Sequence, residues 1–149
     1  MAPRAMAAAL EEARAAFAAG EVPVGAVVTL SDGGILARAR NAMRERADPT
    51  AHAEILAIRE AARIIASERL TGCDLYVTLE PCAMCAAAIS FARIRRLYYG
   101  AEDQKQGAVD NGPRFFASPA CHHAPEVYGG MSEREAAALM RRFFAERRD

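Results

Sequence analysis

The sequence contains no apolar run near the roughly 20 residues that a membrane-spanning helix needs, which argues against a membrane-spanning protein. Its alanine-rich opening is interrupted by Glu11, Glu12 and Arg14, which makes this segment a poor signal peptide. Hydrophobic residues make up 52% and charged residues 26% of the chain, a composition typical of globular proteins. We therefore expect a globular, cytoplasmic protein.

Neither sign of charge is in excess, because 19 basic residues balance 19 acidic ones. This balance counts against a nucleic-acid partner, which usually meets a basic surface. Local basic segments remain at residues 93–96 (RIRR) and 141–148 (RRFFAERR), and the second also carries two phenylalanines. From its residues alone, the second segment is best explained as a solvated, arginine-rich face of a terminal helix.

Cysteine is scarce, with four residues in a chain of 149. Because the cytoplasm keeps thiols reduced, we do not expect disulfides. Cys73, Cys82, Cys85 and Cys121 are instead interpreted as metal ligands or small core residues. The sequence also lacks internal repeats and linkers, and its length suits one domain with a sizeable core. We expect residues 1–149 to form that single domain.

Hydrophobic periodicity and turn residues predict helices that alternate with strands. Helices are expected over residues 4–19, 51–66, 82–92 and 132 to about 147, strands over 22–30, 35–40, 74–79 and 95–100, and loops over 41–50 and 101–125. Thr50 is expected to cap the second helix, and the SERE segment at 132–135 to cap the last one. The alternation predicts a three-layer α/β fold, in which an antiparallel hairpin is followed by parallel strands joined by helices.

Four polar side chains suited to metal chemistry fall at the starts of two predicted helices. His52 and Glu54 open one helix, and Cys82 and Cys85 lie on one face of the first turn of another, directly after Pro81. In an α/β fold the helix N-termini gather at the carboxyl ends of the strands, so we expect these residues to meet. A helix N-terminus also favours the thiolate forms that bind metals.

One histidine and two thiolates supply three zinc ligands. A structural zinc usually has four protein ligands, whereas a catalytic zinc has three and leaves one position for water. Zinc lowers the pKa of that water to about 7, and Glu54 is the candidate for moving its proton. We favour an open catalytic zinc. The alternatives are a closed structural site, with Cys121, His122 or His123 as fourth ligand, and a site without metal.

The HAE segment at 52–54 and the PCAMC segment at 81–85 together resemble the signature of the zinc-dependent cytidine and deoxycytidylate deaminase superfamily. A wider match, to the bacterial tRNA-specific adenosine deaminases, covers nearly the whole chain. It consists of EVPVGAVV (21–28), DPTAHAE (48–54), LYVTLEPCAMCAAAI (75–89), ARIRRLYYGAEDQKQGA (92–108) and RRFFAERR (141–148). Guanine deaminases carry segments similar to the first three. YGAEDQKQGA and the terminal phenylalanines with arginines resemble the tRNA enzymes.

The resemblance implies a three-layer α/β/α, cytidine-deaminase-like fold with a central mixed five-stranded sheet. It implies one Zn²⁺ per subunit and a homodimer. His52, Cys82 and Cys85 match the zinc ligands of the family, and Glu54 matches its proton shuttle. In the family this glutamate is not a ligand.

The resemblance also assigns substrate contacts. These are Asn41 to the purine ring, Val24, Ala53 and Pro81 to the base pocket, Asp103 and Lys105 to RNA near the flipped base, and Phe144 and Arg147 to anticodon nucleotides. From the residues alone, Asn41 could instead cap a loop, and Val24 could be a core residue. Phe143 and Phe144 are adjacent, so a helix cannot bury both on one face; we expect one in the core and Phe144 available for stacking.

The activity implied is hydrolytic deamination of adenosine to inosine in RNA, at the wobble position of a tRNA anticodon, with the anticodon stem-loop as partner. Arg95, Arg96 and the terminal arginines are candidate phosphate contacts. One alternative is a deaminase of a free base or nucleoside, such as guanine or cytosine, in which the terminal helix would be a lid. Another is a non-catalytic zinc protein, such as a pseudo-enzyme subunit. Glu54 argues against the last, because a protein that only binds zinc needs no proton shuttle.

Overall fold

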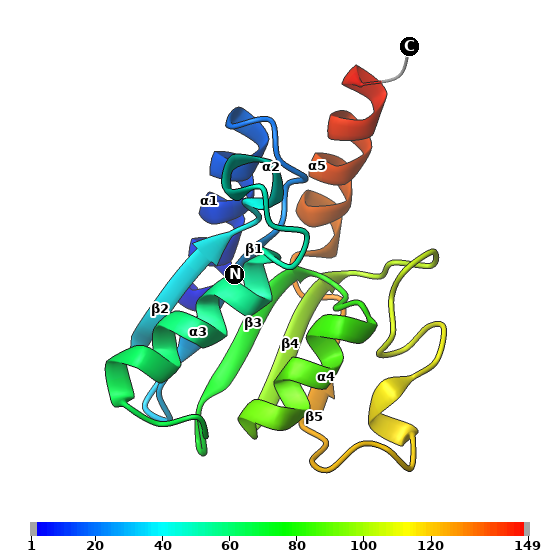
Figure 1. The fold of residues 1–149 in the computed structure, drawn as a ribbon. Helices are drawn as coiled ribbons and strands as arrows, with labels where there is room; N and C mark the ends of the chain where they lie inside the picture. The colour runs from blue at the N-terminus through cyan, green and yellow to red at the C-terminus, as the bar shows by residue number, and fades with distance from the viewer. Residues whose placement is uncertain (1–2, 148–149) are drawn as a thin grey trace.

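A computed structural model describes residues 3–147, so Arg148, within the basic segment 141–148, lies outside the described residues. Five strands form one sheet in the order β2-β1-β3-β4-β5 (Figure 1). The strands are β1 (Gly25–Thr29), β2 (Ile35–Arg40), β3 (Asp74–Leu79), β4 (Arg96–Ala101) and β5 (Glu126–Tyr128). β1 is antiparallel to both β2 and β3, whereas β3, β4 and β5 run parallel. The predicted mixed five-stranded sheet is confirmed.

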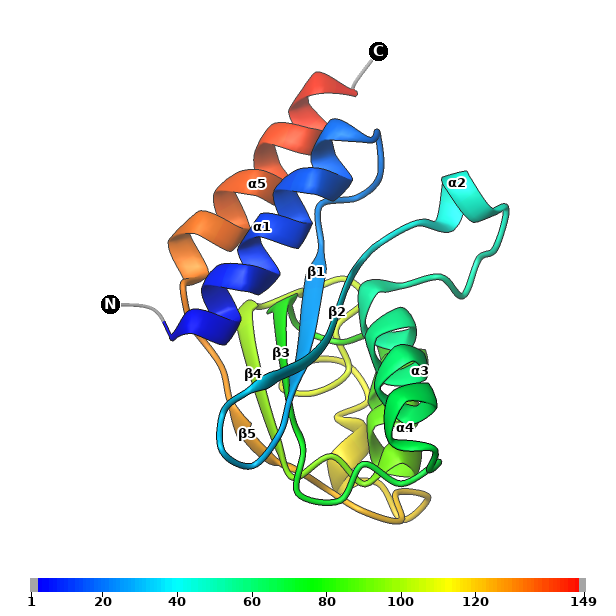
Figure 2. The same ribbon diagram turned by 90° about the vertical axis from the view of Figure 1, so that its left-hand side faces the viewer.

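Helices cover both faces of this sheet. They are α1 (Arg4–Ala18), α2 (Met43–Arg46), α3 (Ala53–Ile65), α4 (Ala83–Ala92) and α5 (Glu133–Glu146). Figure 2 shows α1 and α5 together on one face and α3 with α4 on the other, which confirms the predicted three-layer α/β/α fold. None of the helices in residues 3–147 is both long and apolar enough to cross a membrane.

The buried core lies on both sides of β1, all of whose residues are buried. Because a helix layer covers each face, Ala26, Val27 and Val28 in the middle of the strand are all apolar and inaccessible to solvent. Gly25 allows α1 to lie directly on the sheet, since a Cβ added there would sit 2.0 Å from the carbonyl oxygen of Ala9 and 2.7 Å from the nitrogen of Ala13.

The predicted loops contain short elements that the sequence pattern does not reveal. Residues 41–50 include the single turn of α2, and the long loop after β4 includes a 3-10 helix, η1 (Phe115–Ala117). β5 follows this loop and has only three residues. Its pairing with β4 defines it as a strand, rather than any periodicity of its own.

The predicted cap of α3 is wrong, and the predicted cap of α5 has the right residue without its side-chain contact. His52, not Thr50, is the N-cap of α3, and the hydroxyl of Thr50 instead donates to Asp48 at 2.7 Å. Ser132 is the N-cap of α5 but adopts a left-handed conformation with φ 56° and makes no capping hydrogen bond through its side chain. Its Oγ therefore does not supply the capping-box contact.

Candidate active site

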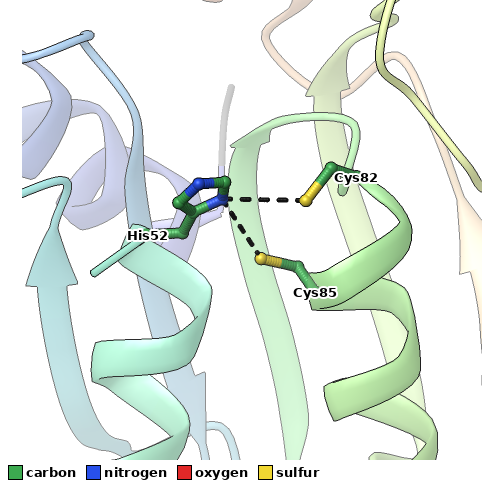
Figure 3. A group of neighbouring side chains, drawn as sticks. All are labelled: His52, Cys82 and Cys85. Atoms are coloured by element: carbon green, nitrogen blue, oxygen red, sulfur yellow. Dashed lines mark hydrogen bonds between the residues drawn. The ribbon is translucent and has the colours of Figure 1, made fainter. Parts of the chain in front are cut away.

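Three potential metal ligands meet where α3 and α4 begin (Figure 3). The Nδ1 of His52 lies 3.7 Å from the Sγ of Cys82 and 3.5 Å from the Sγ of Cys85. All three ligand atoms lie within 4.8 Å of one another. The structure therefore brings together the histidine and both cysteines, although they come from two segments of the chain.

The backbone conformation explains how the histidine and the two cysteines, which are far apart in the sequence, come together. His52 and Cys82 are the N-caps of α3 and α4 and have extended backbone conformations, whereas Cys85 lies inside the first turn of α4. Because β3 leads directly into α4, its carboxyl end places the cysteines at the edge of the sheet, beside the start of α3. The expected meeting at this edge is what the structure shows.

The spacing of the three atoms suits a tetrahedral ion. With a Zn–S bond of about 2.3 Å and a Zn–N bond of about 2.0 Å, a tetrahedral angle places nitrogen and sulfur about 3.5 Å apart. The two nitrogen–sulfur distances, 3.5 and 3.7 Å, agree with this value. One imidazole and two thiols are also a donor set typical of zinc.

The cluster is electrostatically prepared for a cation. A hydrogen bond from Cys85 and the neighbouring imidazole of His52 lower the pKa of Cys82 to about 4. The hydrogen bond to Cys82 and burial raise the pKa of Cys85 above its usual value. The Cys82 contact likewise raises the pKa of His52. The protons that these groups share are the ones that a bound divalent ion displaces.

Glu54 stands beside this cluster and is nearly inaccessible, with 4% of its surface exposed. Burial raises its pKa to about 7, although a hydrogen bond with Cys85 opposes the rise. His52 precedes the helical region while Glu54 is inside it, so both can face the cluster despite being two residues apart. A carboxyl group that titrates near neutral pH can both accept and return a proton.

The residues assigned to the base pocket are buried around the same edge. Val24, Ala53 and Pro81 are all buried. The Oδ1 of Asn41 accepts the backbone N–H of Ala53 at 2.7 Å, so this side chain caps the start of α3 in addition to any contact with a substrate. This contact uses the amide oxygen of Asn41 and not its Nδ2 group.

Asp103 and Lys105 lie in the turn after β4, and Lys105 is exposed. One carboxylate oxygen of Asp103 accepts the backbone N–H groups of Lys105 and Gln106, each at 3.0 Å. This turn lies next to the cluster, because Gly107 forms a β-bridge with Cys82. The structure therefore places both residues near the metal ligands.

The two phenylalanines of α5 have different environments, as expected. Phe143 is 5% exposed and packs edge-to-face against Phe17 at 5.8 Å, whereas Phe144 is 49% exposed. The guanidinium of Arg147 lies 3.8 Å from the ring centre of Phe143, so it is folded back on the helix. Figures 1 and 2 show α5 extending beyond the sheet on the side where α3 and α4 begin.

The other arginines considered as phosphate contacts are engaged within the chain. Arg95 donates to both carboxylate oxygens of Asp74, at 2.9 and 2.8 Å, at the end of β3 that lies away from the cluster. Arg96 pairs with Glu126 at 3.6 Å. On α5, Arg142 likewise pairs with Glu146 at 3.6 Å, and Arg141 is exposed.

The alternative fourth ligands lie elsewhere. The Sγ of Cys121 contacts the hydroxyl of Ser90 at 3.5 Å, and the Nε2 of His123 is 2.7 Å from the carbonyl of Ile94. His122 packs against the ring of Phe91. Within residues 3–147, the metal-binding group comprises only the three residues described above, which favours an open site over a closed one.

The sequence analysis missed Glu80, which lies two residues before Cys82. It is 2% exposed, and its carboxylate accepts hydrogen bonds from the loop after β4. The signal available was a single acidic residue between an apolar strand and Pro81, and nothing local showed that the donors lie more than twenty residues away.

Comparison with known proteins places this site in a family. A family model described as MafB19-like deaminase matches residues 2–148. A tRNA-specific adenosine deaminase from Agrobacterium fabrum is 62% identical over 140 residues, covering 94% of this chain and 91% of the relative. Another from Rickettsia bellii is 50% identical and covers 95% of this chain and 98% of the relative.

Solved structures show similarity to the same group of deaminases. A structure from a study of A-to-I editing by tRNA:A34 deaminases superposes with a TM-score of 0.89 at 61% identity, covering 91% of this chain and 97% of that one. A guanine deaminase from Bacillus subtilis is more distant, with a TM-score of 0.64 and 32% identity over 97% of this chain and 96% of that one. The chain therefore belongs to the MafB19-like deaminase family and, within it, to the tRNA-specific adenosine deaminases.

Proposed function

We propose that this protein is a zinc-dependent hydrolase that converts adenosine to inosine at the wobble position of a tRNA anticodon. The observation that carries the chemistry is the spacing of His52, Cys82 and Cys85, whose three ligand atoms match the corners of a tetrahedral zinc site. The similarity to tRNA-specific adenosine deaminases supports the substrate. Zinc, when bound, lowers the pKa of a water molecule to about 7.

Glu54 moves the protons of this reaction. Deamination forms a bond between C6 of the adenine ring and the oxygen of water, and breaks the bond between C6 and the exocyclic amino nitrogen. Water is consumed and ammonia leaves. The carboxylate of Glu54 accepts a proton from the water and returns it to the departing amino group. Its pKa of about 7 suits both directions, because it can be either charged or neutral near physiological pH.

The target base occupies a pocket beside the cluster. Val24, Ala53 and Pro81 line it, and the Nδ2 of Asn41 donates a hydrogen bond to the purine ring. The cap that Asn41 forms on the N–H of Ala53 supports this orientation, since it fixes the amide with its donor group free. The adenosine must leave its stack to enter, which costs less in a single-stranded loop than in a duplex.

The anticodon stem-loop contacts two further regions. Asp103 and Lys105 lie in the turn next to Cys82 and meet the RNA beside the flipped base. On α5, the exposed ring of Phe144 stacks with an anticodon nucleotide, and Arg147 contributes charge at the same helix end. A neutral chain can bind RNA in this way because its charges need only be arranged locally.

The resemblance also bears on the oligomeric state and the cellular location of the protein. We propose a homodimer, which is the oligomeric state that the resemblance to the tRNA-specific adenosine deaminases implies. We propose a cytoplasmic location, because the tRNA substrate is processed there. Size-exclusion chromatography with light scattering tests the dimer directly.

A product assay separates the tRNA enzyme from a deaminase of free bases. Zinc-loaded protein is incubated with an anticodon stem-loop RNA that has adenosine at the wobble position and, in parallel, with free guanine, cytosine and adenosine. We expect inosine in the RNA and no ammonia from the small molecules. Ammonia from a free base alone would contradict the RNA substrate and would make α5 a lid.

A further inference from the structure

The carboxylate of Glu80 accepts five hydrogen bonds although only 2% of the residue is exposed. Its Oε1 accepts the backbone N–H of Asp103 at 3.0 Å and the side-chain amide of Asn111 at 2.6 Å. Its Oε2 accepts the backbone N–H groups of Val109, Asp110 and Asn111 at 3.0, 2.9 and 3.1 Å. All five donors belong to the loop that follows β4.

This loop lies directly against the segment that carries a metal ligand. Ala108 donates its backbone N–H to the carbonyl of Pro81 at 2.9 Å, and Gly107 forms a β-bridge with Cys82. A Cβ added to Gly107 would lie 2.6 Å from the carboxyl carbon of Glu80, so only glycine allows the turn to sit this close. One buried carboxylate thus joins the end of β3 to the loop beside Cys82.

Glu80 is held in its charged form by these donors. Burial alone would raise the pKa of its carboxyl group. The hydrogen bonds from Asp103, Asn111, Asp110 and Val109 outweigh burial and hold the pKa below its usual value. Hydrogen bonds to a charged acceptor are about twice as strong as those between neutral groups, so the contact orders the loop firmly.

We propose that Glu80 is a positioning residue whose carboxylate holds residues 103–111 as a preformed wall of the substrate site beside Cys82. The RNA then meets Asp103 and Lys105 already in place. This inference rests on the proposed function, because it is the RNA substrate that needs this wall. Glu80 itself touches neither the metal ligands' donor atoms nor, in this account, the substrate.

The role predicts a particular kinetic effect. If the loop is ordered only part of the time, the apparent affinity for RNA falls by the fraction of molecules in the competent state. The groups that carry out the chemistry, Glu54 and the three metal ligands, keep their positions. Loss of Glu80 should therefore raise KM for the RNA much more than it lowers kcat.

The variant Glu80→Gln tests this effect. Glutamine has the same shape but only one acceptor oxygen, so it can satisfy at most three of the five donors. The matched control is Asp74→Asn at the opposite end of β3. Asp74 is 6% exposed, and its carboxylate accepts two hydrogen bonds, both from Arg95. The control thus disturbs a buried carboxylate at the other end of β3, far from the loop.

Three measurements are made on both variants and on wild-type protein: kcat and KM on the stem-loop RNA, zinc per chain, and amide hydrogen exchange of residues 103–111. For Glu80→Gln we expect KM to rise about tenfold or more with kcat within about threefold, zinc retained, and faster exchange in the loop. For Asp74→Asn we expect lower thermal stability with KM and loop exchange unchanged. An unchanged KM, unchanged loop exchange or lost zinc in folded Glu80→Gln would overturn the proposal.

The proposal can still be tested if Glu80→Gln does not fold or if wild-type protein is inactive on the RNA. If Glu80→Gln does not fold, Asn111→Ala removes one of the five hydrogen bonds to Glu80, together with the bond from the same amide to Glu102; a smaller rise in KM supports the role and none overturns it. If wild-type protein does not deaminate the RNA, the proposed function fails, while hydrogen exchange still decides whether Glu80 orders the loop.

Discussion

The Nδ1 of His52 and the Sγ of Cys85 lie 3.5 Å apart although 33 residues separate them in the chain. Each residue stands at the beginning of a helix on the same face of the sheet, and β3 delivers the second helix to the start of the first. A small set of ligands at two helix starts is therefore enough to build the metal site.

Removal of any ligand should abolish zinc binding. We expect His52→Ala and Cys85→Ser to contain no stoichiometric zinc and to lose activity, because two ligands do not hold the ion. The free energy of unfolding should also fall, by about 4 kcal/mol where free zinc exceeds its Kd about 1,000-fold. Metal analysis and thermal unfolding measure both. Cys121→Ser is the control, and loss of zinc in that variant would mean that the site is closed by a fourth ligand.

Glu54→Gln should separate chemistry from metal binding. The amide cannot accept and return a proton, so we expect kcat to fall about 100- to 10,000-fold while one zinc per chain is retained. Glu60→Gln, further along the same helix and paired with Arg63, should leave kcat unchanged. If Glu54→Gln lost both zinc and folded structure, its role would be structural.

Two substitutions of Asn41 should distinguish its cap from its substrate contact. Asn41→Asp keeps the acceptor for the N–H of Ala53 but loses the amide donor, so we expect near-normal stability and a KM raised about tenfold, the loss of one hydrogen bond to the base. Asn41→Ala loses both and should also lower the free energy of unfolding by about 1 kcal/mol. Full activity of Asn41→Asp would show that the base does not use this donor.

The adjacent phenylalanines of α5 should respond in opposite ways. Phe144→Ala should weaken RNA binding by about 1–3 kcal/mol, the range for a lost base stack, with little effect on stability because the ring is 49% exposed. Phe143→Ala should instead destabilise the fold by about 3–5 kcal/mol. Fluorescence anisotropy with labelled stem-loop RNA and chemical denaturation measure the two quantities. Equal RNA affinity for Phe144→Ala and wild type would remove Phe144 from the interface.

Salt should weaken binding of the stem-loop. Each phosphate contact releases counterions, so the logarithm of the affinity should fall linearly with the logarithm of salt concentration. Neutralising Arg141 and Arg142, which are exposed on α5, should make this slope shallower. A flat salt response of wild-type protein would contradict binding through phosphates.

The fold could be predicted from the sequence where a local pattern has a single physical cause. Helix α3 has apolar residues at helical spacing, and β1 is a short apolar run of the kind that a covered central strand requires. β5 could not be predicted in this way, because its three residues are partly exposed and become a strand only by pairing with β4. The cap predicted for α3 failed for a similar reason, because the acceptor for the N–H of Ala53 comes from Asn41, twelve residues earlier in the chain.

The candidate site could also be predicted only in part. His52, Glu54, Cys82 and Cys85 have side chains whose chemistry is specific, and their positions at helix starts determine that they converge. Glu80 was missed because its role depends on donors that reach it from a loop 23 to 31 residues later, and no spacing in the sequence indicates such a contact. Residues that act through the packing of distant segments require the structure.

The most direct test of the central claim is the position of the product in the RNA. Zinc-loaded protein is incubated with an anticodon stem-loop that carries adenosine at the wobble position and at other loop positions, and inosine is mapped by sequencing. The account predicts inosine at the wobble position alone, and none with Glu54→Gln. Inosine spread over all the adenosines, or none at all with zinc-loaded wild-type protein, would contradict it.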